Sequence, residues 1–186
     1  IDINDKSAVG YLLQSWFAEW MKRNDIFFRV KPNTQEFPDF LLLPENDDKG
    51  LLEIKTFDYN NGPNFDVANF EAYCRSLKTN INRLDADYLI FGYTLEDNIL
   101  NIKNIWLKKI WEITCSSDRY PLRLQIKQDV LYNIRPVKWY GNGSTSKYKP
   151  FKNKGKFVEA LYKTLNQYSK TKKDSAEWLK IDSEKK

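Results

Sequence analysis

Apolar residues near the start of the chain recur at helical spacing. They occupy every third or fourth position, at Val9, Leu12, Leu13, Trp16, Phe17, Trp20 and Met21. This spacing predicts an amphipathic helix with a wide apolar face. Asp5 or Ser7 is suited to cap its N-terminus, and the basic residues Lys22 and Arg23 favour its C-terminus.

Shorter apolar runs predict the strands of a sheet. Segment 86–93 is almost continuously apolar, as in a strand buried on both faces, whereas 122–128 alternates apolar and polar residues, as in a half-exposed strand. Segment 130–136 either continues that strand or bends away from it. Segment 102–113 fits a strand followed by a short helix, although its periodicity does not decide this. The remaining predicted strands are 27–30, 41–43 and 50–52, the last two joined by the polar turn 44–49.

Two further segments have helical spacing. Apolar residues from 67 to 84 form one stripe, with Asp66 as a candidate N-cap, and residues 156–168 form a second amphipathic helix. Strands and helices in this order predict an α/β fold, with helices packed against a mixed central sheet.

Length and composition indicate one domain. A chain of 186 residues with 41% hydrophobic residues can bury a core. We assign residues 1–168 to this domain and residues 169–186 to a polar, charged tail, where Trp178 and Leu179 fit a short docked helix. The net charge of +5 and the aromatic content of 15% suit a polyanionic partner, although +5 is also an ordinary solubility charge.

The absence of histidine removes several chemistries. Without His, the chain cannot carry a Ser-His-Asp or Cys-His hydrolase site or a His-bound metal. Cys74 and Cys115 are expected to be buried, reduced thiols of a cytosolic protein. No signal peptide or membrane-spanning apolar run is evident. Because the chain begins at Ile1 and not at Met, an earlier native segment with a targeting signal stays open.

Three residues carry the main functional hypothesis. Asp39 lies near the start of the first strand of the predicted hairpin, and Glu53 and Lys55 lie on its partner strand. Residues two apart on a strand leave the same face, so Glu53 and Lys55 should project together. Two carboxylates can hold Mg²⁺, which prefers oxygen ligands, while an ammonium positions the attacking water. The competing interpretation is an exposed ion pair across neighbouring positions.

The Pro38-Asp39 dipeptide followed by Glu53-Ile54-Lys55 resembles the catalytic motif of the PD-(D/E)xK nuclease superfamily. That resemblance implies an acidic residue in the preceding helix, four positions after a glycine. Here Gly10 is followed by Gln14, so Gln14 is the candidate site amide, and Glu19 is the alternative acidic ligand.

Basic and amide residues suggest where DNA would bind. The segment 135–152 holds basic and aromatic residues without an acidic one. Basic side chains neutralise phosphates, and amides, hydroxyls and arginines can also contact bases. The alternatives are an ordinary loop and a solvated helix face. The predicted DNA-binding residues are Asn60, Asn61, Asn64, Arg75, Lys78, Arg135, Lys138, Trp139, Tyr140, Asn142, Ser144, Lys147 and Lys149.

Longer segments resemble the NgoBV family of type II restriction endonucleases. The resemblance rests on residues 37–40, 52–58, 63–73, 84–93 and 103–111. It implies a restriction-endonuclease-like core and a bacterial, cytoplasmic, Mg²⁺-dependent enzyme. Such an enzyme cuts double-stranded DNA at a short palindrome of GGNNCC type, leaves 5′-phosphates and acts as a homodimer. Two alternatives stay open: a repair or junction-resolving nuclease of the same superfamily, and a non-cleaving DNA-binding protein of the same fold.

Overall fold

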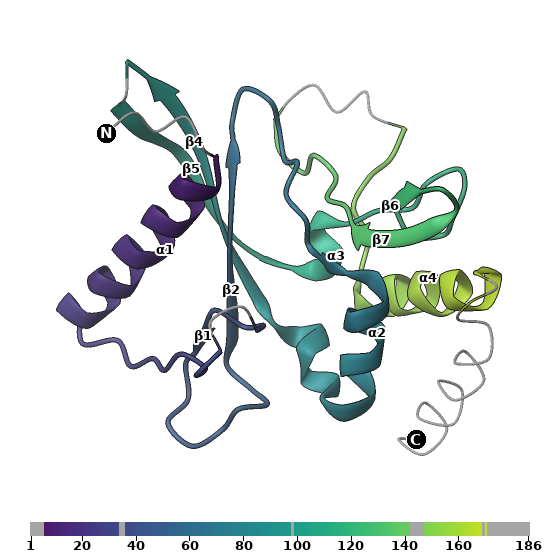
Figure 1. Cartoon of the computed structure of the whole chain (residues 1–186), viewed down its shortest axis with the longest axis horizontal. Helices are drawn as coiled ribbons and strands as arrows, with labels where there is room; N and C mark the ends of the chain where they lie inside the picture. Colours follow the sequence, from purple (N-terminus) through teal and green to yellow (C-terminus); the bar gives the residue numbers. More distant parts are fainter. Residues whose placement is uncertain (1–5, 34–35, 98, 142–146, 169, 171–186) are drawn as a thin grey trace. The chain divides into compact units, whose positions relative to one another are not determined.

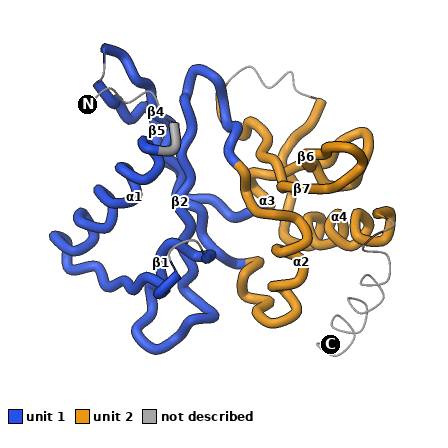
Figure 2. Tube along the Cα trace, viewed as in Figure 1, with its two compact units in different colours: residues 1–65, 85–110 blue, residues 66–84, 111–186 orange. Residues whose placement is uncertain are grey.

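The computed structural model describes residues 6–33, 36–97, 99–141, 147–168 and 170. The chain forms two compact units (Figure 2). The first comprises residues 1–65 and 85–110, and the second comprises residues 66–84 and 111–186. Among the described helices, none has the length and apolar character needed to cross a membrane.

The first unit is built on a four-stranded sheet (Figure 1). Its strands are β1 (Phe40–Leu41), β2 (Leu51–Asp58), β4 (Asp87–Glu96) and β5 (Ile99–Lys109), in the order β1-β2-β4-β5. β2 runs parallel to β4, and the two outer pairs are antiparallel. The sheet is therefore mixed, because the chain leaves β2, passes through the second unit and returns to β4 in the same direction.

One face of this sheet is packed against helix α1 (Lys6–Arg23). Side chains alternate between the faces of a strand, so one set of β2 and β4 residues points to the helix. Burial of these apolar side chains is the main stabilising contribution to the unit. The buried members of this core are Val9, Leu13, Met21, Phe40, Leu52, Ile54, Phe91 and Tyr93.

The second unit contains a small antiparallel sheet. Its strands are β3 (Ala68–Asn69), β6 (Leu124–Lys127) and β7 (Val130–Ile134), in the order β3-β7-β6. Gln128 and Asp129 form the β6–β7 turn with positive φ angles of 47° and 62°.

The second unit also contains the helices α2 (Phe70–Thr79) and α4 (Lys154–Gln167). Both helices bury their apolar stripes, and the rings of Tyr73 and Phe157 meet edge to face. The shorter helical segments are η1 (Ile81–Asp85) and α3 (Ile110–Ile113).

Much of the predicted secondary structure is confirmed. The helix before the hairpin, the strand at 86–93 and the last helix are present as α1, β4 and α4. Segment 102–113 is a strand followed by a short helix, and segment 130–136 turns back to pair with β6. Cys74 and Cys115 are buried free thiols, as expected. The predicted tail lies outside the described residues, apart from Lys170.

Three local predictions are wrong. Segment 27–30 is not a strand, because only Arg29 makes an isolated bridge, to Leu41. The helix expected from residue 67 begins at Phe70, and its cap is Asn69, whose side chain accepts from the backbone N–H of Ala72. Asp66, the expected cap, instead forms an ion pair with Arg135. The sequence contains the true cap, but long-range pairing of β3 with β7 delays the helix start.

One of the two predicted N-cap residues of α1 is wrong. Ser7 lies inside the helix, which already includes Lys6, so it is not the cap. Asp5 lies outside the described residues.

Candidate active site

Asp39 lies immediately before β1, at the edge of the first unit's sheet. Antiparallel pairing of Phe40 with Leu52 brings this end of β1 beside the middle of β2. The backbone N–H of Ile54 donates to Asp39 Oδ2 over 2.7 Å. The hairpin therefore fixes the carboxylate through a backbone donor that no motif specifies.

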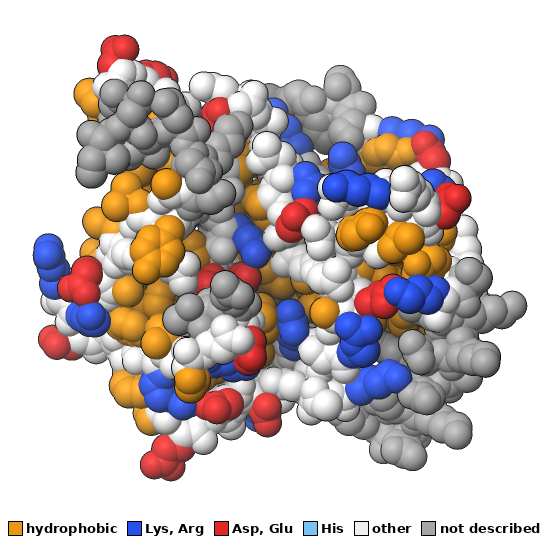
Figure 3. Space-filling model, in the orientation of Figure 1, with side chains coloured by type: hydrophobic (Ala, Val, Ile, Leu, Met, Phe, Trp, Pro, Cys, Tyr) orange, Lys and Arg blue, Asp and Glu red, His pale blue; other side chains and the backbone are white. Residues whose placement is uncertain are grey.

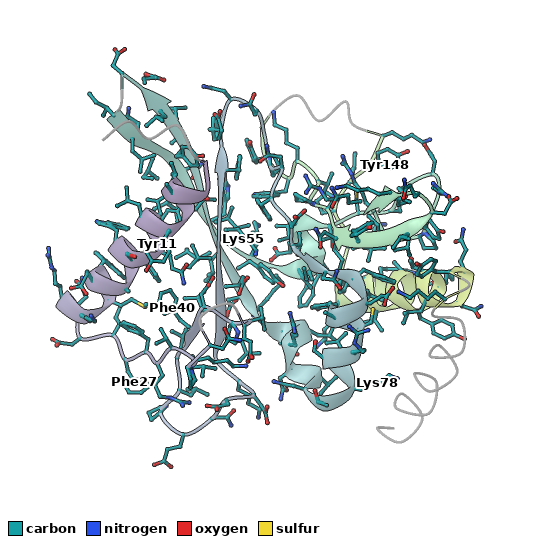
Figure 4. The ribbon with its side chains drawn as sticks, viewed as in Figure 1. Tyr11, Phe27, Phe40, Lys55, Lys78 and Tyr148 are labelled. Carbon is teal, nitrogen blue, oxygen red and sulfur yellow. The ribbon has the colours of Figure 1, made fainter. Side chains whose placement is uncertain are left out.

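Glu53 and Lys55 project from the same face of β2, as the alternation of a strand predicts. Lys55 Nζ donates to Glu53 Oε1 over 2.9 Å. The Glu53 side chain is only 13% exposed, and the Lys55 side chain is 19% exposed. The pair is thus mostly shielded from water, unlike the exposed ion pair of the competing interpretation. In Figure 4, Lys55 is labelled on β2.

Gln14 connects α1 to this cluster. Its Nε2 donates to Asp39 Oδ1 over 3.0 Å. The helix approaches β2 closely at Gly10, where an added Cβ would lie 3.3 Å from Thr56 Oγ1. This approach places Gln14, one turn further along the same side of α1, at the carboxylate.

Glu19 lies away from the cluster. Its side chain is 57% exposed and forms an ion pair with Lys22, with the two atoms 2.6 Å apart. The structure therefore brings Gln14, and not Glu19, to Asp39.

The electrostatics of Asp39 set it apart from the other described carboxyl groups. Burial, together with the charge of Glu53, raises the pKa of Asp39 from 3.8 to about 6. The Ile54 N–H, the Lys55 ammonium and the Gln14 amide oppose this shift but do not cancel it. Two carboxylates held together in a desolvated site repel each other, and a cation between them relieves the repulsion.

The donor set suits one class of metal. Among the described residues, no three His, Cys, Asp or Glu side chains gather as a metal-binding group. Asp39 and Glu53 offer two carboxylates, which is what Mg²⁺ commonly takes from a protein when water and a phosphate complete its shell.

The predicted DNA-binding residues are divided between the two units. Asn60, Asn61 and Asn64 belong to the first unit, on the loop after β2. Asp58 holds this loop: its carboxylate accepts from the backbone N–H of Asn60 and from the side chain of Asn61 over 3.0 and 2.5 Å. Asn64 is exposed.

The remaining candidates belong to the second unit. Lys78, Lys138 and Lys149 are exposed. The half-buried rings of Trp139 and Tyr140 contact each other. Asn142 and Ser144 lie outside the described residues.

Some of the basic candidates form ion pairs with acidic side chains. Arg75 pairs with Glu71, Arg135 with Asp66, and Lys147 with Asp118. The last two pairs could not be expected from the sequence, because Asp66 and Asp118 lie 69 and 29 residues from their partners.

The mixed sheet, with helix α1 packed on one face, agrees with a restriction-endonuclease-like α/β fold. A solved structure of the NlaIV restriction endonuclease matches with a TM-score of 0.89 and 38% identity, covering 97% of this chain and 73% of that one. The predicted fold class is therefore confirmed.

Sequence comparison then gives the family. The model of the NgoBV restriction endonuclease family matches residues 1–185. The type II restriction enzyme NlaIV of Neisseria lactamica is 39% identical over 180 residues, 96% of this chain and 73% of that protein. The type II restriction enzyme NgoBV of Neisseria gonorrhoeae is 37% identical over 130 residues, 69% of this chain and 73% of that protein. The chain belongs to the NgoBV restriction endonuclease family, which confirms the predicted family and enzyme class.

Proposed function

We propose that this restriction endonuclease hydrolyses phosphodiester bonds of double-stranded DNA with Mg²⁺ as its cofactor. Asp39, Glu53 and Lys55 would form its catalytic site. The observation that carries the proposal is the half-buried Asp39 carboxyl beside Glu53. Desolvation and the neighbouring charge of Glu53 raise the pKa of Asp39 to about 6. Such a pair costs free energy as a bare dianion and is stabilised by a divalent cation.

Asp39 and Glu53 are the residues that would hold the ion. Mg²⁺ would neutralise charge on the phosphate and lower the pKa of a bound water. Its hard character fits an oxygen-only donor set. The sequence has no histidine, and both cysteines belong to the second unit.

Lys55 and Gln14 act on the groups around the carboxylates. Lys55 Nζ donates to Glu53. It would orient the attacking water and stabilise negative charge that develops at phosphorus. Gln14 fixes the orientation of Asp39 through its 3.0 Å hydrogen bond. Attack on phosphorus with departure of the 3′-oxygen leaves a 5′-phosphate on one product end.

The DNA partner would be held by basic and amide groups of both units. Lys78, Lys138 and Lys149 are exposed cations suited to phosphate contacts, and Asn64 is an exposed amide. Arg75, Arg135 and Lys147 would exchange their acidic partners for phosphates. We infer that residues 1–168 form the nuclease, as the sequence analysis proposed.

The target would be a short palindrome, with GGNNCC as the type that the family resemblance implies. A palindrome is matched most simply by two copies related by a twofold axis, each cutting one strand. The two curated relatives are named as type II restriction enzymes, which agrees with a site-specific cut. A bacterial cytoplasmic location follows from the same proposal.

Plasmid cleavage tests this function. Purified protein is incubated with supercoiled plasmid, with Mg²⁺ and with excess chelator, and the product ends are mapped by sequencing. Discrete Mg²⁺-dependent fragments with 5′-phosphates are expected. Nicking without discrete fragments would favour a nuclease that follows DNA structure, and binding without any cleavage would favour a non-cleaving DNA-binding protein.

A further inference from the structure

Helix α1 covers only part of the sheet face on which it packs. The β4–β5 register fixes which β5 side chains share that face, because paired residues of antiparallel strands project to the same side. Ile102, Ile105 and Leu107 are the partners of Tyr93, Phe91 and Leu89, whose side chains belong to or pack against the α1 core. These three β5 residues therefore point to the α1 side of the sheet.

The same three side chains are exposed. Ile102, Ile105 and Leu107 are 39%, 47% and 61% exposed. Helix width explains this: a helix is about 10 Å across, whereas four strands about 4.8 Å apart span more than that. One helix cannot cover the whole face, and β5 lies at its uncovered edge.

One flank of α1 extends this apolar surface. Leu12, Trp16 and Trp20 follow at intervals of four, so they form one stripe, and they are 48%, 50% and 42% exposed. The ring of Trp16 meets the ring of Phe91 edge to face, with centroids 6.3 Å apart, and Phe91 is the register partner of Ile105. The stripe therefore borders the β5 face.

We call these six residues the α1–β5 patch. In Figure 3, hydrophobic side chains gather over α1, at the left of the view. From its exposed fractions the patch presents on the order of 600 Å² of apolar surface, at the upper end for a monomeric protein. With a polar rim, it approaches the roughly 800 Å² per partner that a standard protein interface buries.

The two halves of the patch are suited to each other. The α1 stripe is a ridge that carries two Trp side chains, the residue type most enriched at interface hot spots. The β5 half is a sheet face that no helix of the described residues covers. In a twofold dimer the same surface of each copy meets its partner, so that surface must carry both a ridge and the face that the ridge covers. The α1–β5 patch carries both. DNA is a polyanion, so an apolar surface of this kind does not suit it.

We infer that the α1–β5 patch is the surface through which two copies of this chain associate. The α1 stripe of each copy covers the β5 face of its partner, around a twofold axis. The inference deepens the proposed function, which requires a dimer, by locating the dimer surface in the first unit.

Sedimentation velocity over a concentration series tests it without reference to cleavage. The full chain is expected to sediment as a dimer, and both Leu12→Glu and Leu107→Lys should weaken association at least tenfold. Both side chains are exposed, so neither change places a charge in the core. Tyr11→Glu is the matched control: Tyr11 is 74% exposed on the same helix, about 100° around from Leu12, and its variant should remain dimeric.

Mixing the Leu12→Glu and Leu107→Lys proteins gives the sharper result. In a mixed dimer, one contact pairs the introduced carboxylate with the introduced ammonium, and the symmetric contact keeps the original leucines, so mixing should restore association. A monomeric wild type, dimeric variants, a dissociated Tyr11→Glu protein or a mixture that stays monomeric would each overturn the inference. A dimer that fails to cut plasmid would instead count against the proposed function alone.

Discussion

Gln14 of helix α1 donates a hydrogen bond to Asp39 at the edge of the sheet, over 3.0 Å and across 25 positions of sequence. Asp39 also accepts from the backbone N–H of Ile54, so a helix donor and a strand donor both orient its carboxylate. The geometry of the proposed metal ligand thus depends on how α1 packs on β2.

Replacing Gln14 tests this dependence. Gln14→Ala should cost about 1 kcal/mol of stability, the usual net contribution of a hydrogen bond, and slow cleavage roughly tenfold because Asp39 loses one orienting donor. Thermal melts and single-turnover cleavage measure both effects, with exposed Ser15→Ala as the control. An unchanged cleavage rate would show that Gln14 is only a packing residue.

Gln14→Glu should strengthen the binding of Mg²⁺ at the site. A third carboxylate beside Asp39 adds repulsion in the metal-free protein and attraction for a divalent cation. We expect a lower melting temperature in chelator and half-maximal cleavage at lower Mg²⁺ concentration. A higher Mg²⁺ requirement would place the ion away from Gln14.

Asp39→Asn should remove the loss of stability that the wild type shows as pH rises. Because the pKa of Asp39 is raised from 3.8 to about 6, the folded protein keeps a proton that the unfolded chain has released, and stability falls as pH rises through this range. At pH 8 in chelator, the variant should exceed the wild type by about 1–3 kcal/mol, and the two should converge below about pH 4.

Denaturant unfolding at several pH values measures this difference. Asp48→Asn, which removes a carboxylate from the exposed hairpin turn, controls for the loss of one negative charge. Added Mg²⁺ should stabilise the wild type but not Asp39→Asn, whose cleavage should be abolished. An equal Mg²⁺ effect on both proteins would contradict the assignment of Asp39 as a ligand.

Lys55→Ala should separate catalysis from folding. Loss of the ammonium removes a group that orients water and stabilises developing charge, so cleavage should fall about 100- to 1000-fold. Circular dichroism and DNA binding in Ca²⁺ should remain close to wild type. Lys103→Ala, an exposed lysine of β5, is the control. Normal cleavage by Lys55→Ala would remove Lys55 from the site.

Neutralising the basic segment should flatten the salt dependence of DNA binding. The triple change of Lys138, Lys147 and Lys149 to Ala removes up to three phosphate contacts, each worth about 0.9 in the logarithmic salt slope. Fluorescence anisotropy at several salt concentrations measures the slope. The matched control changes Lys154, Lys156 and Lys163 of α4 to Ala, and an equal effect of both triples would move the DNA surface elsewhere.

Features that depend on local spacing could be predicted from the amino-acid sequence. A strand repeats every two residues, so Glu53 and Lys55 had to share a face, and their 2.9 Å contact follows from that repeat. The apolar spacing of α1 and the turn between β1 and β2 are equally local. Together with the resemblance to the PD-(D/E)xK superfamily and the NgoBV family, these signals predicted an α/β nuclease with Asp39, Glu53 and Lys55 as its candidate site.

Which helix residue reaches Asp39 depends on how α1 packs against the sheet. The apolar face of α1 is wide because Leu12, Trp16 and Trp20 extend it, so the sequence left the rotation of the helix open. Packing of Val9, Leu13 and Met21 into the core turned Gln14 toward the carboxylate and left Glu19 in solvent. The acidic partners of Arg135 and Lys147 also could not be predicted from the sequence, because contacts between residues distant in sequence form only when the chain has folded.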